Sequence, residues 1–378
     1  MSRGLVPSGG VSISQTEARH LALAAGSGFA PVEGSGPAAV ANLLQRLGFV
    51  QIDTISVVER AHHHVLGCRL ENYKPEWLEN ADVFEYWGHA ASYLPWSDYR
   101  YTLHRKANVK EHGYDWYKIE RTDVQRVLER IRGEGPLRSK DFEEVKGRAG
   151  WWDWKPAKRA LEYLFMSGEL MVRSRQGFQK VFDLTQRVLP GNLDTSLPTP
   201  REQALWYIRR ALDLWGLVAR DEIAYQRREH AELVNPGLRE LVEAGELVTC
   251  DVEGSDRPYW APSRAFAGQG ELPPPEPRLR ILSPFDPLVI HRKRLQRLFG
   301  YDYKLECYVP EPKRTFGYFG MPLLWNRAIV GLIDAKLDRK ARTLTVKNLR
   351  YDGPEGQKKA FDTAVSKALE LYRNRLLS

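Results

Sequence analysis

The chain has 378 residues, of which 43% are hydrophobic and 28% are charged, and its 56 Lys and Arg against 48 Asp and Glu give a formal net charge of +8. This length and composition exclude a disordered or fibrous protein and predict about two to three domains with real hydrophobic cores. The basic excess favours a polyanionic partner.

Cysteine content and hydropathy restrict the cofactors and the location of the chain. Cys68, Cys250 and Cys307 are far apart and form no C-x-x-C pair, which argues against a zinc ribbon or an iron–sulfur cluster. We therefore expect no metal and no organic cofactor. Isolated thiols indicate a reducing compartment, and no apolar run approaches the ~18 residues of a membrane span. We expect a cytoplasmic, nucleoid-associated monomer without a membrane partner.

The first part of the chain, 12–113, alternates helical patterns with a short strand. A capping box at Ser14 predicts a helix, and a second helix over 37–47 ends at Gly48. The alternating, β-branched stretch 49–55 predicts a strand, and 59–70 is helical again. This order is compatible with a relative of the helix-turn-helix proteins.

The next two parts, 114–197 and 198–271, follow one plan, which is three helices and then a hairpin. In the first, we expect helices over 124–131, 137–142 and 155–166, and a basic hairpin over 168–182. In the second, we expect helices over 200–214, 219–225 and 238–244, and a hairpin over 248–260. The phrases SGELMV at 167–172 and AGELVT at 244–249 occupy the same place in each plan, which indicates an internal repeat. Three helices and a hairpin predict a winged helix.

The last part, 277–378, follows a stiff, proline-rich linker at 272–277. Its pattern predicts strands over 305–309, 316–321, 328–335 and 343–349 and a closing helix over 360–377. The predicted fold class is therefore α+β, with tandem winged-helix (helix-turn-helix) modules followed by a C-terminal β-rich unit. We expect the basic segment 338–342 to lie in a hairpin turn, and such a hairpin could enter a minor groove.

Gln51 and Asp53 are two apart on a predicted strand. Side chains at this spacing share one face, and Ile52 turns the other way into the core. A carboxylate beside a carboxamide could hold a water between them, because the carboxylate takes its proton and the amide orients it. By itself the pair is a weak signal, because a Gln and an Asp on an exposed strand face are usually just solvated.

Several separated blocks strengthen the functional interpretation. LGFVQIDTISVVERAHHHVLGCR at 47–69, EYWGHAASYLP at 85–95, SPFDPLV at 283–289, YVPEPKRTFGYFGMPLL at 308–324 and VGLIDAKLDRKA at 330–341 resemble the winged-helix DNA glycosylases of the AlkZ and AlkX (YcaQ) family. The resemblance runs from about residue 12 to the C-terminus. The family's catalytic motif is Gln, an apolar residue, then Gln or Asp. Gln51-Ile52-Asp53 therefore resembles the AlkX branch rather than the AlkZ branch.

The resemblance implies a DNA glycosylase with Gln51 and Asp53 as its catalytic residues. Its substrate would be double-stranded DNA carrying alkylated guanine or an interstrand crosslink. Alkylation at N7 makes guanine a cationic leaving group, so a carboxylate and a placed water suffice to hydrolyse the N-glycosidic bond. No lysine lies in the motif, which favours a monofunctional hydrolase that leaves an abasic site. The alternative is a winged-helix transcription regulator in which the pair has no catalytic role.

Candidate DNA contacts are spread over four segments. Three successive histidines on a helix point about 100° apart and cannot all face one ion, so packing or DNA contact is the better interpretation for them. The basic wing and the basic C-terminal segments suit phosphate contacts. The predicted DNA-binding residues are His62, His63, His64, Arg69, Arg173, Arg175, Lys180, Lys313, Arg314, Arg339 and Lys340. Trp87, Trp96, Trp151, Trp152 and Trp154 could stack on bases, although most aromatic side chains lie in cores.

Overall fold

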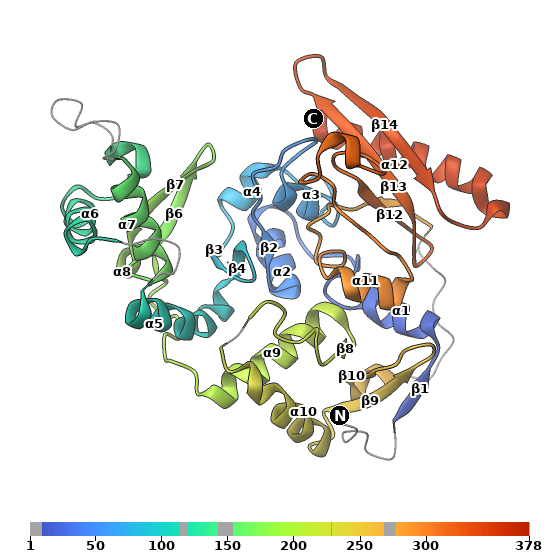
Figure 1. Cartoon of the computed structure of the whole chain (residues 1–378), viewed down its shortest axis with the longest axis horizontal. Coiled ribbons are helices and arrows are strands. Elements are labelled where there is room, and N and C mark those ends of the chain that lie inside the picture. The colour runs from blue at the N-terminus through green and yellow to red at the C-terminus, as the bar shows by residue number, and fades with distance from the viewer. Residues whose placement is uncertain (1–9, 114–118, 143–153, 228, 268–276, 378) are drawn as a thin grey trace.

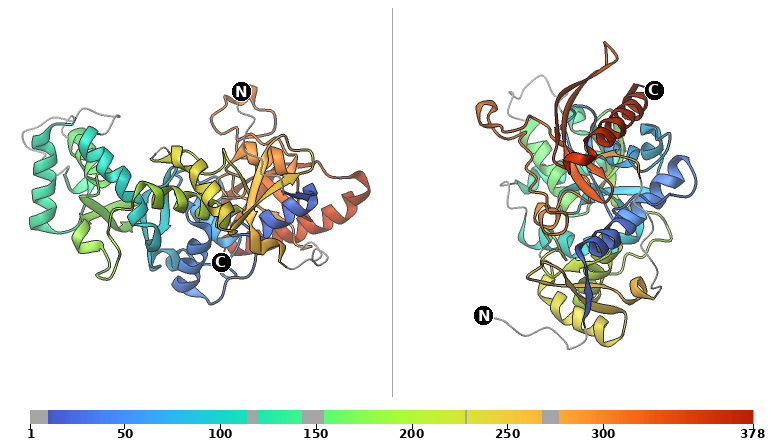
Figure 2. Two further views of the ribbon diagram at one scale, coloured as in Figure 1. Left: turned by 90° about the horizontal axis from the view of Figure 1, so that it is seen from below. Right: turned by 90° about the vertical axis from the view of Figure 1, so that its right-hand side faces the viewer.

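The computed structural model describes residues 10–113, 119–142, 154–227, 229–267 and 277–377. The helices and strands form a curved, elongated array (Figures 1 and 2). The part that contains the helices α6 (Arg121–Glu134) and α7 (Trp154–Met166) lies at one end of the array. The sheet formed by β12 (Met321–Trp325), β13 (Ala328–Asp338) and β14 (Thr343–Tyr351) lies at the other. The prediction of a mixed α+β fold is confirmed.

The first part surrounds a small sheet with the strand order β2-β4-β3. The longest helix of this part, α2 (Gly36–Leu47), ends at Gly48, as the sequence predicts, and Gly48 itself adopts the left-handed backbone conformation with φ 72°. The predicted strand over 49–55 is too long, because the strand ends at Gln51 and the chain then turns. Its elements are α2 (Gly36–Leu47), β2 (Val50–Gln51), α3 (Ala61–Gly67), α4 (Pro75–Glu79), β3 (Val83–Trp87), β4 (Ala91–Pro95) and α5 (Leu103–His112).

The second part forms a sheet with the order β5-β7-β6 beneath two helices. The predicted helix over 137–142 is wrong, since these residues form a short strand and a 3-10 turn. Pairing of Leu137 with Phe182 explains this, because it draws the segment into the sheet. The elements are α6 (Arg121–Glu134), β5 (Leu137–Arg138), η3 (Ser139–Phe142), α7 (Trp154–Met166), β6 (Leu170–Gln176), β7 (Gln179–Leu184) and α8 (Thr185–Val188).

The third part contains the sheet β1-β9-β10-β8, and its first strand comes from the N-terminal end of the chain. Val11 to Ile13 pair in parallel with Cys250 to Val252. The segment 11–24 therefore packs away from the first predicted module. The predicted helix over 219–225 is a strand and turns instead. The elements are β1 (Val11–Ile13), α1 (Gln15–Ala24), α9 (Pro200–Trp215), β8 (Val218–Ala219), α10 (Val234–Glu243), β9 (Leu247–Val252) and β10 (Pro258–Pro262).

The last part is built on the antiparallel sheet β11-β12-β13-β14, whose longest hairpin projects from the body (Figures 1 and 2). The predicted strands over 305–309 and 316–321 are wrong, because this stretch is a loop. The linker residues 272–276 lie outside the described residues. The elements are β11 (Arg280–Ile281), α11 (Arg292–Phe299), η6 (Glu311–Lys313), β12 (Met321–Trp325), β13 (Ala328–Asp338), β14 (Thr343–Tyr351) and α12 (Lys358–Leu377). Further short 3-10 helices are η1 (Trp96–Asp98), η2 (Arg100–Thr102), η4 (Ala231–Leu233), η5 (Ser263–Phe266) and η7 (Glu355–Gln357).

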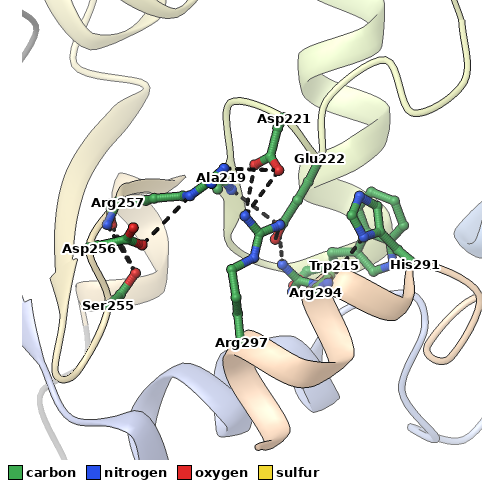
Figure 3. Close-up of polar contacts among 10 residues, drawn as sticks. All are labelled: Trp215, Ala219, Asp221, Glu222, Ser255, Asp256, Arg257, His291, Arg294 and Arg297. Atoms are coloured by element: carbon green, nitrogen blue, oxygen red, sulfur yellow. Dashed lines mark hydrogen bonds and ion pairs between the residues drawn. The ribbon is translucent and has the colours of Figure 1, made fainter. Parts of the chain in front are cut away.

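A buried ionic network joins the third part to the last part (Figure 3). Arg294 on α11 is fully buried and pairs with the buried carboxylate of Glu222, and its guanidinium also donates to the Trp215 carbonyl at 3.0 Å. Arg297, one turn further on, donates to Glu222 at 3.0 Å and to Asp221 at 3.0 Å. Two arginines of one helix thus hold one loop of the neighbouring part. In the described part of the chain, no helix is long and apolar enough to cross a membrane.

Candidate active site

Gln51 lies at the end of the short strand β2. Its backbone pairs with Ser92 of β4, and the next residue, Ile52, donates its N–H to the Ala91 carbonyl at 2.8 Å. The Gln51 side chain is buried, and its Oε1 lies 3.0 Å from Nε2 of His89. Ile52 is also buried, as expected for a residue that faces the core. Sheet pairing therefore fixes the Gln51 backbone, and a histidine contacts its carboxamide.

Asp53 lies beyond the end of the strand, so the prediction that it shares a strand face with Gln51 is wrong. Its Oδ1 accepts a hydrogen bond from the backbone N–H of Ile55 at 2.7 Å, and this local turn ends the strand. The side chain is half-buried. Asp53 therefore presents its carboxylate from a turn, next to the buried Gln51.

The loop 306–318 lies close to Asp53. Burial raises the pKa of the Cys307 thiol, and the negative charge of Asp53 raises it further. Burial, Cys307 and Asp53 together raise the pKa of the Tyr308 phenol. Tyr308 is nevertheless 78% exposed, so a large aromatic ring projects into solvent near the carboxylate. Sequence reasoning missed Tyr308, although it begins one of the family blocks.

Glu306 holds this loop in its shape. Its buried carboxylate accepts backbone hydrogen bonds from Thr315 at 2.8 Å, Phe316 at 2.8 Å and Gly317 at 3.2 Å. The bond from Thr315 is the largest cause that lowers the pKa of Glu306, and together these bonds lower it to about 2. These bonds turn the chain back on itself, which explains why the two predicted strands do not form.

Lys313 and Arg314, two predicted phosphate contacts, lie on the same loop. Lys313 is exposed. Arg314 donates its Nε–H to the Val309 carbonyl at 2.9 Å, and its guanidinium lies 5.0 Å from the centroid of the Tyr318 ring. Both cations thus lie on the loop whose Cys307 and Tyr308 are near Asp53, and their contact with phosphate stays a prediction.

The projecting hairpin also borders the turn that follows Asp53. Arg339 donates to the Val58 carbonyl at 2.8 Å, and the N–H of Leu337 lies 3.4 Å from the Val57 carbonyl. Arg339 and Lys340 remain exposed at the hairpin turn. Of the four predicted C-terminal phosphate contacts, Arg339 therefore touches the segment 53–58 directly, although 281 residues separate it from Val58 in the sequence. Lys340 is its neighbour on the hairpin, and Lys313 and Arg314 lie on the loop whose Cys307 is near Asp53.

The three histidines of α3 have different surroundings. His62 is buried under the Phe178 ring, and burial holds its pKa well below the usual range. His63 is half-buried, its Nδ1 lies 2.8 Å from the Tyr73 hydroxyl, and burial lowers its pKa to about 4. His64 is buried, and its Nε2 donates to the Ile281 carbonyl at 2.9 Å. The predicted DNA contact is therefore wrong for His64, because its ring packs between two parts of the fold.

Arg69 is a structural residue. Its guanidinium makes two hydrogen bonds to Asp286, at 2.7 and 2.8 Å, and both side chains are essentially inaccessible to solvent. The predicted DNA contact of Arg69 is wrong, because a cation that is buried with its counterion cannot reach a phosphate. The family blocks at 47–69 and 283–289 meet in this pair, so they connect the first and last parts of the chain.

The wing of the second part, β6 and β7, docks on the first part. Arg175 is bidentate to Glu85 of β3, at 2.5 and 2.8 Å, and Phe178 at the wing turn stacks on His62. The predicted phosphate contact of Arg175 is therefore wrong in this arrangement. Lys180 lies 4.3 Å from the Phe165 ring centroid, while Arg173 is half-exposed beside Asp183. Of the three wing cations, Arg173 is the most accessible.

Among the described residues, no group of three or more His, Cys, Asp or Glu side chains could hold a metal ion. A cavity of about 750 Å³ lies between α12 and the segment 70–74, and neither Gln51 nor Asp53 lines it. Trp96 packs on Phe84 in the core rather than in a stacking platform. Trp151 and Trp152 lie outside the described residues.

The whole fold has a counterpart among known structures. It is similar to the Streptomyces sahachiroi DNA glycosylase AlkZ, with a TM-score of 0.60 and 16% sequence identity over 96% of this chain and 97% of that chain. At this identity the match shows the shared fold. Residues 44–374 also match the model of the AlkZ-like DNA glycosylase family. The chain belongs to this family, and the predicted DNA glycosylase class is confirmed at that level.

Proposed function

We propose that this chain is a monofunctional DNA glycosylase that hydrolyses the N-glycosidic bond of cationic N7-alkylated purines and leaves an abasic site. The substrates include guanines joined in interstrand crosslinks, and the chain belongs to the AlkX branch by its Gln51-Ile52-Asp53 motif. The observation that carries the proposal is the half-buried Asp53, presented from a turn beside Gln51 and near the exposed Tyr308.

The charge of the lesion explains why this small set of groups suffices. N7 alkylation makes the purine a good leaving group without a general acid, and the sugar becomes positively charged as the bond breaks. Asp53 stabilises this charge and accepts a proton from the attacking water. Gln51 donates a hydrogen bond that orients the water. Lys313, Arg314, Arg339 and Lys340 contact the phosphates on either side.

An open site suits a base that cannot leave the duplex. A base that is crosslinked to the opposite strand cannot turn fully into a closed pocket, as ordinary glycosylases require. The position of Asp53 on a surface turn, outside the cavity beside α12, supports such an open mode of action. We further propose that the two repeated parts, 114–197 and 198–271, are winged helices that support the site along the duplex, and that the protein acts as a monomer.

The decisive experiment is single-turnover excision of N7-methylguanine from duplex DNA, read out by cleavage of the abasic product in hot alkali. Asp53→Asn keeps the side-chain shape and removes the charge, so we expect the rate to fall by about two orders of magnitude or more, or roughly 3 kcal/mol of transition-state stabilisation. Gln51→Ala should cost less. Duplex affinity should stay constant or rise in Asp53→Asn.

The matched control is Glu311→Gln, which removes an exposed carboxylate from the neighbouring loop. It should change duplex affinity as much as Asp53→Asn and leave the excision rate unchanged. Full activity in Asp53→Asn, or activity that is lost only in step with affinity, would refute the assignment. Sequence-selective duplex binding without any excision would instead favour the transcription regulator.

A further inference from the structure

A histidine that the sequence analysis did not single out contacts the proposed active site directly. His89 lies in the turn between β3 and β4, and its Nε2 lies 3.0 Å from Oε1 of Gln51. We propose that His89 is the positioning residue that fixes the orientation of the Gln51 carboxamide. This inference rests on the proposed function and extends it to a residue 38 positions further along the chain.

The atoms in contact define the direction of the hydrogen bond. A carboxamide oxygen can only accept, so the proton must lie on Nε2 of His89. This contact leaves both N–H donors of the Gln51 amide for the reaction centre. If the amide rotated by half a turn, its oxygen would face the water in place of these donors. The water would then lose the donor that orients its lone pair towards the sugar.

The ring of His89 is held on two sides. Phe49 packs against it edge-on, with ring centroids 4.7 Å apart, and Tyr225 of the third part lies at 5.8 Å. The turn is closed by a hydrogen bond from Gly88 N–H to the Ala90 carbonyl at 2.9 Å. The imidazole is therefore positioned by the first and third parts together, and it has little freedom to release Gln51.

The surroundings also keep the ring neutral. Burial, and then the nearby cation of Arg227, lower the pKa of His89 to about 3. Arg227 is itself held over the rings of Trp206 and Tyr207, at 4.7 and 5.5 Å from their centroids. The neutral imidazole ring thus carries a single N–H proton, on either Nδ1 or Nε2. Because Gln51 can only accept at this position, that proton stays on Nε2 throughout the working pH range.

The test compares variants that keep or remove the donor. His89→Phe keeps an aromatic ring between Phe49 and Tyr225 but cannot donate, and His89→Gln restores an N–H donor. We expect His89→Phe to lower the single-turnover rate on N7-methylguanine DNA by about tenfold, as the loss of one orienting hydrogen bond predicts, with unchanged duplex affinity. His89→Gln should recover part of the rate.

A double-mutant cycle separates positioning from a general structural effect. If His89 acts only through Gln51, His89→Phe should cause no further loss of rate in a Gln51→Ala background. His104→Phe is the matched control, because His104 donates to the Pro198 carbonyl at 2.7 Å on a different part of the surface. This control should leave the rate unchanged. Full activity of His89→Phe, or losses that add in the double variant, would overturn the inference.

Nitrogen-15 NMR of the imidazole provides a readout that does not depend on activity. The His89 ring should be neutral with its proton on Nε2 between pH 5 and 8, and the Nε2 signal should shift in Gln51→Ala. A ring protonated on Nδ1, or a signal insensitive to Gln51→Ala, would overturn the inference even if His89→Phe failed to fold. Asp53→Asn is measured in parallel. If Asp53→Asn stays active, the proposed function fails, whereas an inactive Asp53→Asn with a fully active His89→Phe refutes the role of His89 alone.

Discussion

Lys106 is a buried amine in the helix α5 of the first part. The residue is 4% exposed, and its Nζ lies 3.8 Å from the centroid of the Tyr99 ring and 4.7 Å from that of Tyr86. Within the described part of the chain, its Nζ has no hydrogen-bond partner. Burial, with a smaller effect of Lys110, lowers the pKa of Lys106 to about 7. At this residue the fold opposes the charged form of the side chain.

This arrangement predicts how stability depends on pH. The pKa of Lys106 is depressed on folding from its unfolded value of about 10.4, so between about pH 7 and 10 the unfolded chain binds more protons. The free energy of unfolding should therefore rise with pH in this range, by up to about 1.4 kcal/mol per pH unit. Lys106→Met should remove this rise and stabilise the protein most at low pH.

Urea unfolding at pH 6.5 and 9 measures the effect. The control is Lys110→Met, because Lys110 is half-exposed beside Glu169 and should change neither the stability nor its pH dependence by much. A Lys106→Met variant with the same pH dependence as the parent protein would contradict the assignment.

At the scale of single elements, the loop 306–318 forms no strand and carries Cys307 and Tyr308, which lie near Asp53. The Glu306 carboxylate accepts hydrogen bonds from backbone N–H groups of the loop, which in a sheet would go to the carbonyls of a neighbouring strand. These bonds hold the loop in one conformation although it belongs to no sheet. Its folded pKa of about 2 lies below the unfolded value of about 4.3. Its stabilising effect is therefore fully present above about pH 4.3 and is lost as the pH falls towards 2.

Glu306→Ala should loosen this loop and leave the rest of the fold intact. We expect hydrogen exchange at Thr315, Phe316 and Gly317 to accelerate by about tenfold or more, because each loses a hydrogen bond to the carboxylate. Excision should slow as Tyr308 loses its position. Glu311→Gln on the same loop is the control and should leave exchange unchanged. Unaltered protection of the three amides in Glu306→Ala would show that other contacts shape the loop.

At the scale of the whole molecule, buried ion pairs connect parts that are distant in sequence. Arg69 with Asp286 joins the first part to the last, and Arg294 with Glu222 joins the last part to the third (Figure 3). Each pair is buried away from water, so removing either partner would leave the other charge buried without a counterion, which is strongly destabilising. These two contacts join the first, third and last parts of the chain.

Glu222→Gln should destabilise the protein by about 3 kcal/mol or more, because it leaves the guanidinium of Arg294 buried without its counterion. Asp221→Asn is the matched control: Asp221 binds the same helix but is 38% exposed, so its loss should cost about 0–1 kcal/mol. Thermal unfolding compares the two variants. Below the transition, excision by both should match the parent protein, since neither residue is near Asp53. Equal melting temperatures for the two variants would contradict the argument.

The sequence by itself determined the elements that depend on local interactions, and it determined the family. The capping box of Ser14, the apolar stripe that ends at Gly48 and the long helix α9 were predicted because neighbouring residues make their hydrogen bonds and set their periodicity. The family blocks pointed to the DNA glycosylase class, and Gln51 and Asp53 were found through the same resemblance. Their roles remain predictions that the proposed experiments address.

Tertiary structure decided where the functional groups lie and which charges are free. Glu306 converted two predicted strands into a loop, and pairing with β9 drew the first strand, β1, into the third part. His89 contacts Gln51, while Arg69 and Arg175 are paired with the buried carboxylates of Asp286 and Glu85. These outcomes depend on contacts between residues far apart in the chain. Local pattern carries no information on them, because a cation that will be buried beside a distant carboxylate has the same neighbours in sequence as one that will meet a phosphate.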